Sequence, residues 1–120
     1  MREVLSITKA LSDESRLRAL IAVKDGELCL CQIIKVLGLS PATVSKHMNI
    51  LELAGLVTRT RRRKWRFYRL AGDSQSRAVK RALEWVLAEL RGDPRVTEDA
   101  RNIRKVRRRD LEELSACYRS

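Results

Sequence analysis

Two cysteines separated by one residue, Cys29 and Cys31, are the side chains of this sequence best suited to chemistry. The apolar periodicity predicts a helix over residues 29–37, and its first turn would hold both thiols, where the helix dipole lowers a thiol pKa. Two thiolates form the ligand set of soft, thiophilic ions. In an ideal helix, residues i and i+2 lie about 200° apart, so one ion binds both sulfurs only if that turn unwinds. The alternative is that both cysteines are buried and pack as small apolar residues.

The other reactive side chains give little support for catalysis. The single histidine, His47, falls on an expected polar helix face, and the five glycines form no phosphate-binding loop. No Ser-His-Asp or Cys-His pairing is indicated. A small thiol-redox enzyme built on Cys-x-Cys is a rival, but the sequence lacks a thioredoxin-like βαβ pattern. We therefore expect a protein that is not an enzyme and carries no organic cofactor.

The charge distribution points to a polyanionic partner. The chain has 26 Lys and Arg against 15 Asp and Glu, a net charge of +11. Residues 59–69 alone carry seven basic groups and no acid. Such a concentrated stripe is the electrostatic footprint of a nucleic-acid binder. The alternative is a basic surface loop that is merely solvated.

The expected elements would present this charge to DNA. Helical patterns occur at residues 3–11, after Ser12, at 29–37 and after Ser40-Pro41, and a short turn containing Gly38 joins the last two. Two helices so joined form a helix-turn-helix. The polar face of the second helix consists of Thr43, Ser45, Lys46, His47 and Asn49.

The sequence then changes to the alternation of β-strands. Residues 56–61 and 65–70 alternate with β-branched and aromatic side chains, which predicts a hairpin. A basic hairpin directly after a helix-turn-helix is a wing. We therefore predict a mainly α fold with a β-hairpin wing (α+β), a winged helix-turn-helix.

Two further helices are expected. Residues 74–90 carry an apolar face that includes Val79, Leu83 and Val86, with Trp85 free to pair with another chain. Residues 97–117 carry a thin apolar face and are interpreted as a partner-dependent or frayed helix. The predicted organisation is a DNA-binding and dimerisation domain over residues 1–92 and a basic helical extension over residues 93–120.

Length and composition limit the class of protein. A chain of 120 residues with 44% apolar residues suits one small domain that dimerisation would help to stabilise. No apolar run approaches the roughly 20 residues of a membrane span, and the N-terminus lacks a signal-peptide pattern. Three cysteines are too few for a disulfide framework. We expect a cytoplasmic protein with reduced thiols and no membrane partner.

Several separated motifs in the right order resemble the ArsR/SmtB transcriptional repressors. The likeness covers about residues 3–90 and rests on the stretches 11–18, 26–31, 39–48, 54–57 and 68–70. The run Glu-Leu-Cys-x-Cys at residues 27–31 is similar to that of the arsenic- and antimony-sensing members. The resemblance implies a homodimer joined through residues 3–11 and 74–90. It also implies that trivalent metalloid on the cysteine pair releases the repressor from DNA.

The sequence departs from the family pattern at several positions. Ile34 stands where arsenic sensors often have a third cysteine, which leaves Cys117 as the possible third ligand. The zinc- and nickel-binding set on the last family helix is broken, because Val86 replaces a histidine. Pro41 replaces a base-reading glutamine. The segment 62–64 lacks the usual wing glycine, so we expect a longer type I loop rather than a tight two-residue turn.

Together these observations predict a homodimeric repressor on double-stranded DNA with an inverted-repeat operator. Its inducer would be As(III) or Sb(III), bound by Cys29 and Cys31, possibly with Cys117. Two rivals share the DNA-binding fold: a repressor that senses thiol oxidation, and an architectural DNA-binding protein without an inducer. The residues expected at DNA are Ser40, Thr43, Ser45, Lys46 and His47 of the helix and Arg61, Arg62, Arg63 and Lys64 of the wing.

Overall fold

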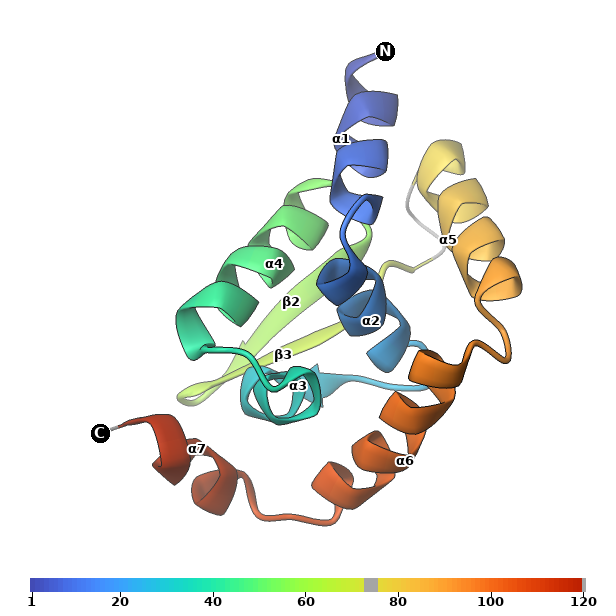
Figure 1. Ribbon diagram of the computed structural model, residues 1–120. Helices are drawn as coiled ribbons and strands as arrows, with labels where there is room; N and C mark the ends of the chain where they lie inside the picture. The colour runs from blue at the N-terminus through green and yellow to red at the C-terminus, as the bar shows by residue number, and fades with distance from the viewer. Residues whose placement is uncertain (73–75, 120) are drawn as a thin grey trace.

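The structure is a computed structural model of the chain that describes residues 1–72 and 76–119, with only the backbone described for residues 116–119. Six helices surround a small sheet, and a seventh lies beside the hairpin turn (Figure 1). The sequence of elements confirms the predicted mainly α fold with a hairpin wing. The elements are α1 (Arg2–Leu11), α2 (Glu14–Ala22), β1 (Leu28–Cys29), α3 (Leu30–Leu37), α4 (Pro41–Leu53), β2 (Val57–Arg62), β3 (Trp65–Leu70), α5 (Arg77–Glu89), α6 (Pro94–Arg107) and α7 (Leu111–Arg119).

Local capping signals fix the helix-turn-helix. The Asp13 side chain accepts hydrogen bonds from two backbone N–H groups at the start of α2. Helix α3 ends at Gly38, whose φ of 69° lies in the left-handed region. Ser40 then caps α4 by accepting from the Thr43 N–H, and Pro41 occupies the first turn. The predicted stop and start signals on either side of Leu39 are thus confirmed.

The sheet contains a strand that the sequence analysis missed. β3 lies in the centre, antiparallel to β2 on one side and to β1 on the other. Leu28 pairs with Tyr68 and Cys29 pairs with Phe67. A strand of two residues has too few side chains to show alternation, so periodicity could not reveal it. As a consequence, the backbone of Cys29 is paired with β3, the central strand of the sheet.

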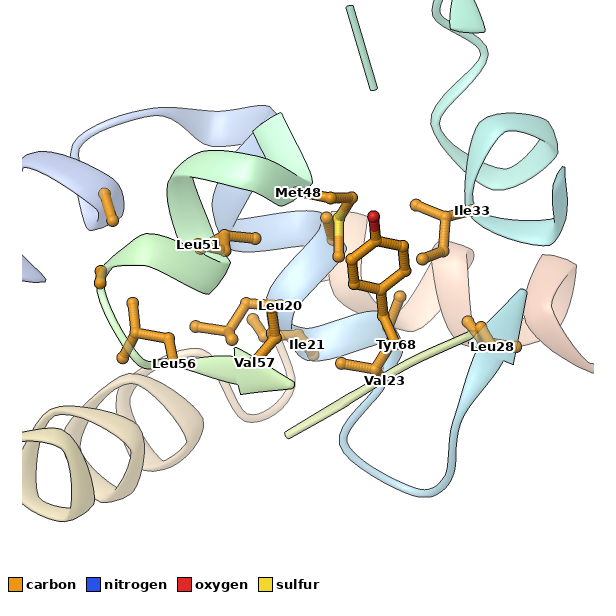
Figure 2. Packing of buried hydrophobic residues seen from close by; sticks show 14 of the residues in the cluster. Leu20, Ile21, Val23, Leu28, Ile33, Met48, Leu51, Leu56, Val57 and Tyr68 are labelled. Atoms are coloured by element: carbon orange, nitrogen blue, oxygen red, sulfur yellow. The ribbon is translucent and has the colours of Figure 1, made fainter. Parts of the chain in front are cut away.

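The larger of two apolar clusters among the described residues joins helices α1 to α5 to the sheet. Figure 2 shows the ring of Tyr68, from β3, directed toward Met48 of α4 and Ile33 of α3. Leu20 and Leu51 are fully buried in the same cluster. Burying a side chain of this size contributes about 1.5–3 kcal/mol. This cluster therefore holds α4 and the hairpin against each other.

The C-terminal region differs from the expected single helix over residues 97–117. Helix α6 begins at Pro94 because the Asp93 side chain caps it, whereas Thr97 bonds back to the Asp93 carbonyl. A turn at 108–110 separates α6 from α7. Asp99 of α6 is buried and bonded to Arg18 of α2. Helix α6 therefore packs on α2 and α3 rather than fraying.

Two helices share an exposed apolar surface. Helices α1 and α5 lie side by side, far from the C-terminus (Figure 1). Val4 and Leu5 of α1 are more than half exposed, and so is Trp85 of α5. Leu53 is 77% exposed at the end of α4, because α4 turns that position away from the core. Among the described residues, no helix is long and apolar enough to cross a membrane.

Candidate functional site

The two thiols meet without any unwinding of the helix. Cys29 is the N-cap of α3 and has extended backbone angles, φ −71° and ψ 150°, while Leu30 is the first helical residue. The Cys31 thiol donates to the Cys29 sulfur at 3.2 Å. The prediction that the two side chains point to opposite sides was wrong, because it assumed that Cys29 was helical. An extended N-cap residue directs its side chain back over the first turn.

The pair is buried and electrostatically activated. Both cysteines are 1% exposed. The pKa of Cys29 is lowered to about 7, chiefly because the Cys31 thiol donates a hydrogen bond to its sulfur. Burial opposes this shift, and the backbone N–H groups of Cys31, Leu30 and Arg66 support it. The expected lowering of a thiol pKa at the helix start is therefore found at Cys29.

An apolar shell from four elements surrounds the sulfurs. It consists of Val36 of α3, Trp65 and Phe67 of β3, Val106 and Ile103 of α6, and Leu111 and Leu114 of α7. A hollow of about 200 Å³ opens onto both sulfurs beside Lys64, Trp65 and Ser115. Among the described residues, no cluster of three or more His, Cys, Asp or Glu could hold a metal ion. The side chain of Cys117 lies outside the described residues, although its helix α7 covers the pair.

The separation of the two sulfurs is closer to that expected for a pyramidal, thiophilic ion than to that expected for tetrahedral zinc. A tetrahedral zinc ion with Zn–S bonds of about 2.3 Å places two sulfurs about 3.8 Å apart. Bonds of the same length that meet near 90°, as in a trigonal pyramid, place them about 3.3 Å apart. The observed 3.2 Å therefore fits a pyramidal, thiophilic ion with little movement of either sulfur.

The exposed face of α4 carries most of the residues expected at DNA. Thr43 and Lys46 are exposed, and Ser45 is half-buried. Ser40 is exposed at the helix start, where its hydroxyl also donates to Thr43 Oγ1 at 2.8 Å. His47 is turned away from this face, since its Nδ1 lies 3.3 Å from the guanidinium of Arg16.

A polar hollow of about 460 Å³ lies between α4 and the hairpin, and it contains residues that the site prediction omitted. Its lining includes Ser45, Lys46 and Asn49 from α4 and Arg59 and Arg66 from the strands. Strand alternation was the signal that could have found the arginines. Residues 59, 61, 66 and 68 share one face of the paired strands, and Tyr68 of that face points toward α4 (Figure 2).

The opposite face of the hairpin turns its basic residues toward the thiol site. Arg62 forms an ion pair with Glu27 and stacks over Phe67, with its guanidinium carbon 3.8 Å from the ring centre. Lys64 pairs with Glu112 of α7 at 2.7 Å. The four predicted wing residues are therefore divided. All four are exposed, but Arg62 and Lys64 form ion pairs with carboxylates, whereas Arg61 and Arg63 form none among the described residues.

The wing turn is tighter than predicted. Arg62 pairs with Trp65, so only Arg63 and Lys64 connect the strands. Arg63 adopts φ 58°, a left-handed conformation that a non-glycine residue rarely takes. The prediction of a longer loop was wrong because the paired strands continue to Arg62 and Trp65 and leave only two residues for the turn. A left-handed Arg63 costs about 1–2 kcal/mol relative to an unstrained residue.

Comparisons with known proteins agree on the family. A model described as "Bacterial regulatory protein, arsR family" matches residues 13–59. The chain is 34% identical over 96 residues to the arsenic resistance transcriptional regulator ArsR1 of Pseudomonas putida, covering 77% of this chain and 69% of that protein. It is 31% identical over 81 residues to a cadmium resistance regulatory protein CadC homolog of Staphylococcus aureus, covering 67% of each. Among solved structures, a homodimeric winged helix-turn-helix DNA-binding domain from Mycobacterium bovis matches with a TM-score of 0.62 and 27% identity, covering 75% of this chain and 82% of that one.

Proposed function

The chain belongs to the ArsR family of DNA-binding transcriptional regulators, and from that membership we propose that it is a repressor released by trivalent arsenic or antimony. The observation that carries this proposal is the buried pair of sulfurs 3.2 Å apart, one of them with a pKa of about 7. Cys29 and Cys31 would bind the ion, and Cys117 of the covering helix α7 would be a third ligand. Among the similar proteins, one is named for arsenic resistance and another for cadmium resistance.

Binding at the pair would reach both DNA-contacting elements. Cys29 is bonded through β1 to Phe67 of the wing strand, and Cys31 lies on α3, which the short turn at Gly38 joins to α4. An ion that bonds both sulfurs therefore fixes the start of α3 relative to β3. Release requires that the ion bind more tightly to the DNA-free arrangement. A hundredfold loss of DNA affinity requires about 2.7 kcal/mol of coupling, which is within the usual range.

The proposed DNA contacts would be of two kinds, base contacts from α4 and backbone contacts from the wing. Ser40 would bind a phosphate at the start of α4, and Thr43, Ser45 and Lys46 would face the major groove. His47 would join them once it has left Arg16. Arg61, Arg62, Arg63 and Lys64 would hold the flanking backbone. In the wing, Arg62 and Lys64 would have to leave their carboxylate partners before they could contact DNA.

A homodimer would place two such surfaces on one operator. Residues 1–92 would form the DNA-binding and dimerisation domain, and residues 93–120 would form a basic extension. The exposed Val4, Leu5 and Trp85 supply an apolar surface for the partner. A two-fold dimer presents its recognition helices about 34 Å apart, which requires an inverted repeat.

A gel shift on the promoter region tests the inducer. We expect arsenite or antimonite to lower the DNA affinity about a hundredfold, and zinc to be a poor substitute because a closed zinc site needs four ligands. Cys29→Ser and Cys31→Ser are each expected to keep DNA binding and lose the response. Cys117→Ser is expected to lose less, since two ligands suffice. The proposal would be refuted if the Cys29→Ser protein left the operator at the same arsenite concentration as the wild-type protein.

The same sulfur contact favours one second candidate, a repressor that senses oxidation. A disulfide needs an S–S distance of about 2.05 Å, so the sulfurs have to approach by about 1.2 Å. Hydrogen peroxide would oxidise both thiols to that disulfide and be reduced to water. Release by peroxide, with no release by arsenite under reducing conditions, would select this candidate.

A further inference from the structure

A hollow between α2, α6 and the end of α5 lies apart from both the thiol pair and the DNA-facing surface. One part of it has a volume of about 250 Å³ and is lined by α2 and α6. An adjoining part of about 430 Å³ continues to the end of α5. The two parts share Ile21, Lys24, Asp25, Val96 and Ala100, so they form one continuous groove, which we name the α2–α6 groove. Its size is within the range of small-molecule sites.

The floor of the α2–α6 groove is apolar. Ile21 and Ala22 of α2 face Val96, Ala100 and Ile103 of α6 across the first part. Leu87 and Leu90 extend the apolar surface toward α5 in the second part. A hydrocarbon chain or an aromatic ring placed there would be removed from water, which contributes about 25 cal/mol per Å² of apolar area.

The rim of the groove is cationic and incompletely neutralised. Its two acids already have partners, since Asp99 is bonded to Arg18 and Asp25 to Lys24. Arg91 and Arg104 also line the groove, and no carboxylate among the described residues forms an ion pair with either of them. Arg107 adds a third positive charge, although its guanidinium donates to the carbonyls of Gly26 and Glu27. An anionic group held at this rim would gain charge-assisted hydrogen bonds.

We propose that the α2–α6 groove binds a small amphipathic anion, a carboxylate or sulfonate with a hydrocarbon or aromatic body. The apolar floor takes the body and the arginines of the rim take the head. This site is distinct from the proposed inducer site, because neither cysteine lines it and Ile103 is the one described residue that belongs to both the groove lining and the apolar shell of the thiols.

Fluorescence of 8-anilinonaphthalene-1-sulfonate, an aromatic sulfonate, provides the test, with decanoate as the displacing carboxylate. We expect saturable binding that decanoate displaces and decanol, which lacks the charge, displaces at least tenfold less well. Arg104→Glu is expected to weaken binding at least tenfold. Arg101→Glu is the matched control, because Arg101 is exposed on the same helix and outside the groove lining, and it is expected to bind as wild type.

A second variant guards against a purely electrostatic effect. Ala100→Trp fills the groove without changing charge and is expected to abolish binding, while circular dichroism checks that the fold is kept. Amide NMR shifts on adding decanoate should concentrate in residues 21–25 and 96–104. Equal loss in Arg101→Glu and Arg104→Glu, equal displacement by decanol, or shifts confined to α1 and α5 would each overturn the proposal. Cys29→Ser is expected to bind the probe normally, so failure of this site and failure of the proposed inducer are distinguishable.

Discussion

The buried ion pair between Arg18 and Asp99 yields the sharpest prediction on stability. Arg18 Nε lies 2.9 Å from Asp99 Oδ2, and Arg18 Nη2 lies 3.0 Å from Oδ1, so the pair is bidentate. Arg18 Nη2 also donates to the Val36 carbonyl at 3.3 Å. The side chains are 10% and 5% exposed. Asp99→Ala removes the one carboxylate that bonds Arg18 among the described residues and leaves the buried guanidinium with the Val36 carbonyl, which we expect to cost about 3–5 kcal/mol.

Urea denaturation measures this cost, at one fixed protein concentration because the unfolding of a dimer depends on it. Glu98→Ala is the matched control, since Glu98 precedes Asp99 on α6 and forms an exposed pair with Arg95 at 3.7 Å. We expect that control to cost less than about 1 kcal/mol. The double variant Arg18→Met, Asp99→Leu is expected to be more stable than Asp99→Ala alone. If Asp99→Ala costs no more than Glu98→Ala, the pair does not hold α6 on α2 and our account of the extension is wrong.

Four further predictions concern the proposed DNA surface and the thiols. Lys46→Ala is expected to weaken binding to the specific site by about 1–3 kcal/mol more than binding to random DNA. Arg63→Ala is expected to weaken both alike and to reduce the slope of log affinity against log salt concentration by about one. Fluorescence anisotropy at several salt concentrations measures both. Arg63→Gly is expected to raise the free energy of unfolding by about 1 kcal/mol, since glycine adopts a positive φ without strain; equal stability of the Gly and Ala variants would contradict this. Cys31→Ala removes the thiol donor and is expected to move the thiolate absorbance of Cys29 near 240 nm from a midpoint of about 7 toward that of a free thiol. Because that pKa is lower in the folded state, wild type is expected to gain stability as pH rises from about 7 to about 9 and to lose that gain below 7, and Cys31→Ala is expected to flatten this dependence.

The helix-turn-helix and the wing could be predicted from the sequence because their signals are local. Ser40, Pro41 and Gly38 act within one turn of the backbone, and strand alternation extends over six residues on each side of the wing. The thiol pair could also be recognised from the sequence as a possible ion-binding site, because residue type and spacing are sufficient for that prediction. The turn of the wing is the exception, because Arg63 adopts a left-handed conformation that its residue type does not predict.

The arrangement around the thiols depended on contacts between distant segments. Cys29 became an extended N-cap because two residues of β1 pair with β3, and that pairing joins Cys29 to Phe67, 38 positions later. Asp99 was buried because Arg18, 81 positions earlier, reaches it across the α2–α6 contact. Neither partner is visible in a window of helix or strand length, so periodicity assigned Cys29 to a helix and gave no sign that Asp99 is buried.

The pairing of β1 with β3 also bears on how the ion selectivity of the proposed site could change. Cys29 uses its backbone to join the sheet and its side chain to meet Cys31, so the two tasks occupy different atoms of one residue. Backbone pairing tolerates many side chains at an edge strand of two residues. A new donor at residue 29 or 31 would therefore alter the selectivity for ions while the hydrogen-bonded connection to the wing is kept. Selection, or an engineer building a reporter for another ion, can vary the ligand set without rebuilding the link to DNA.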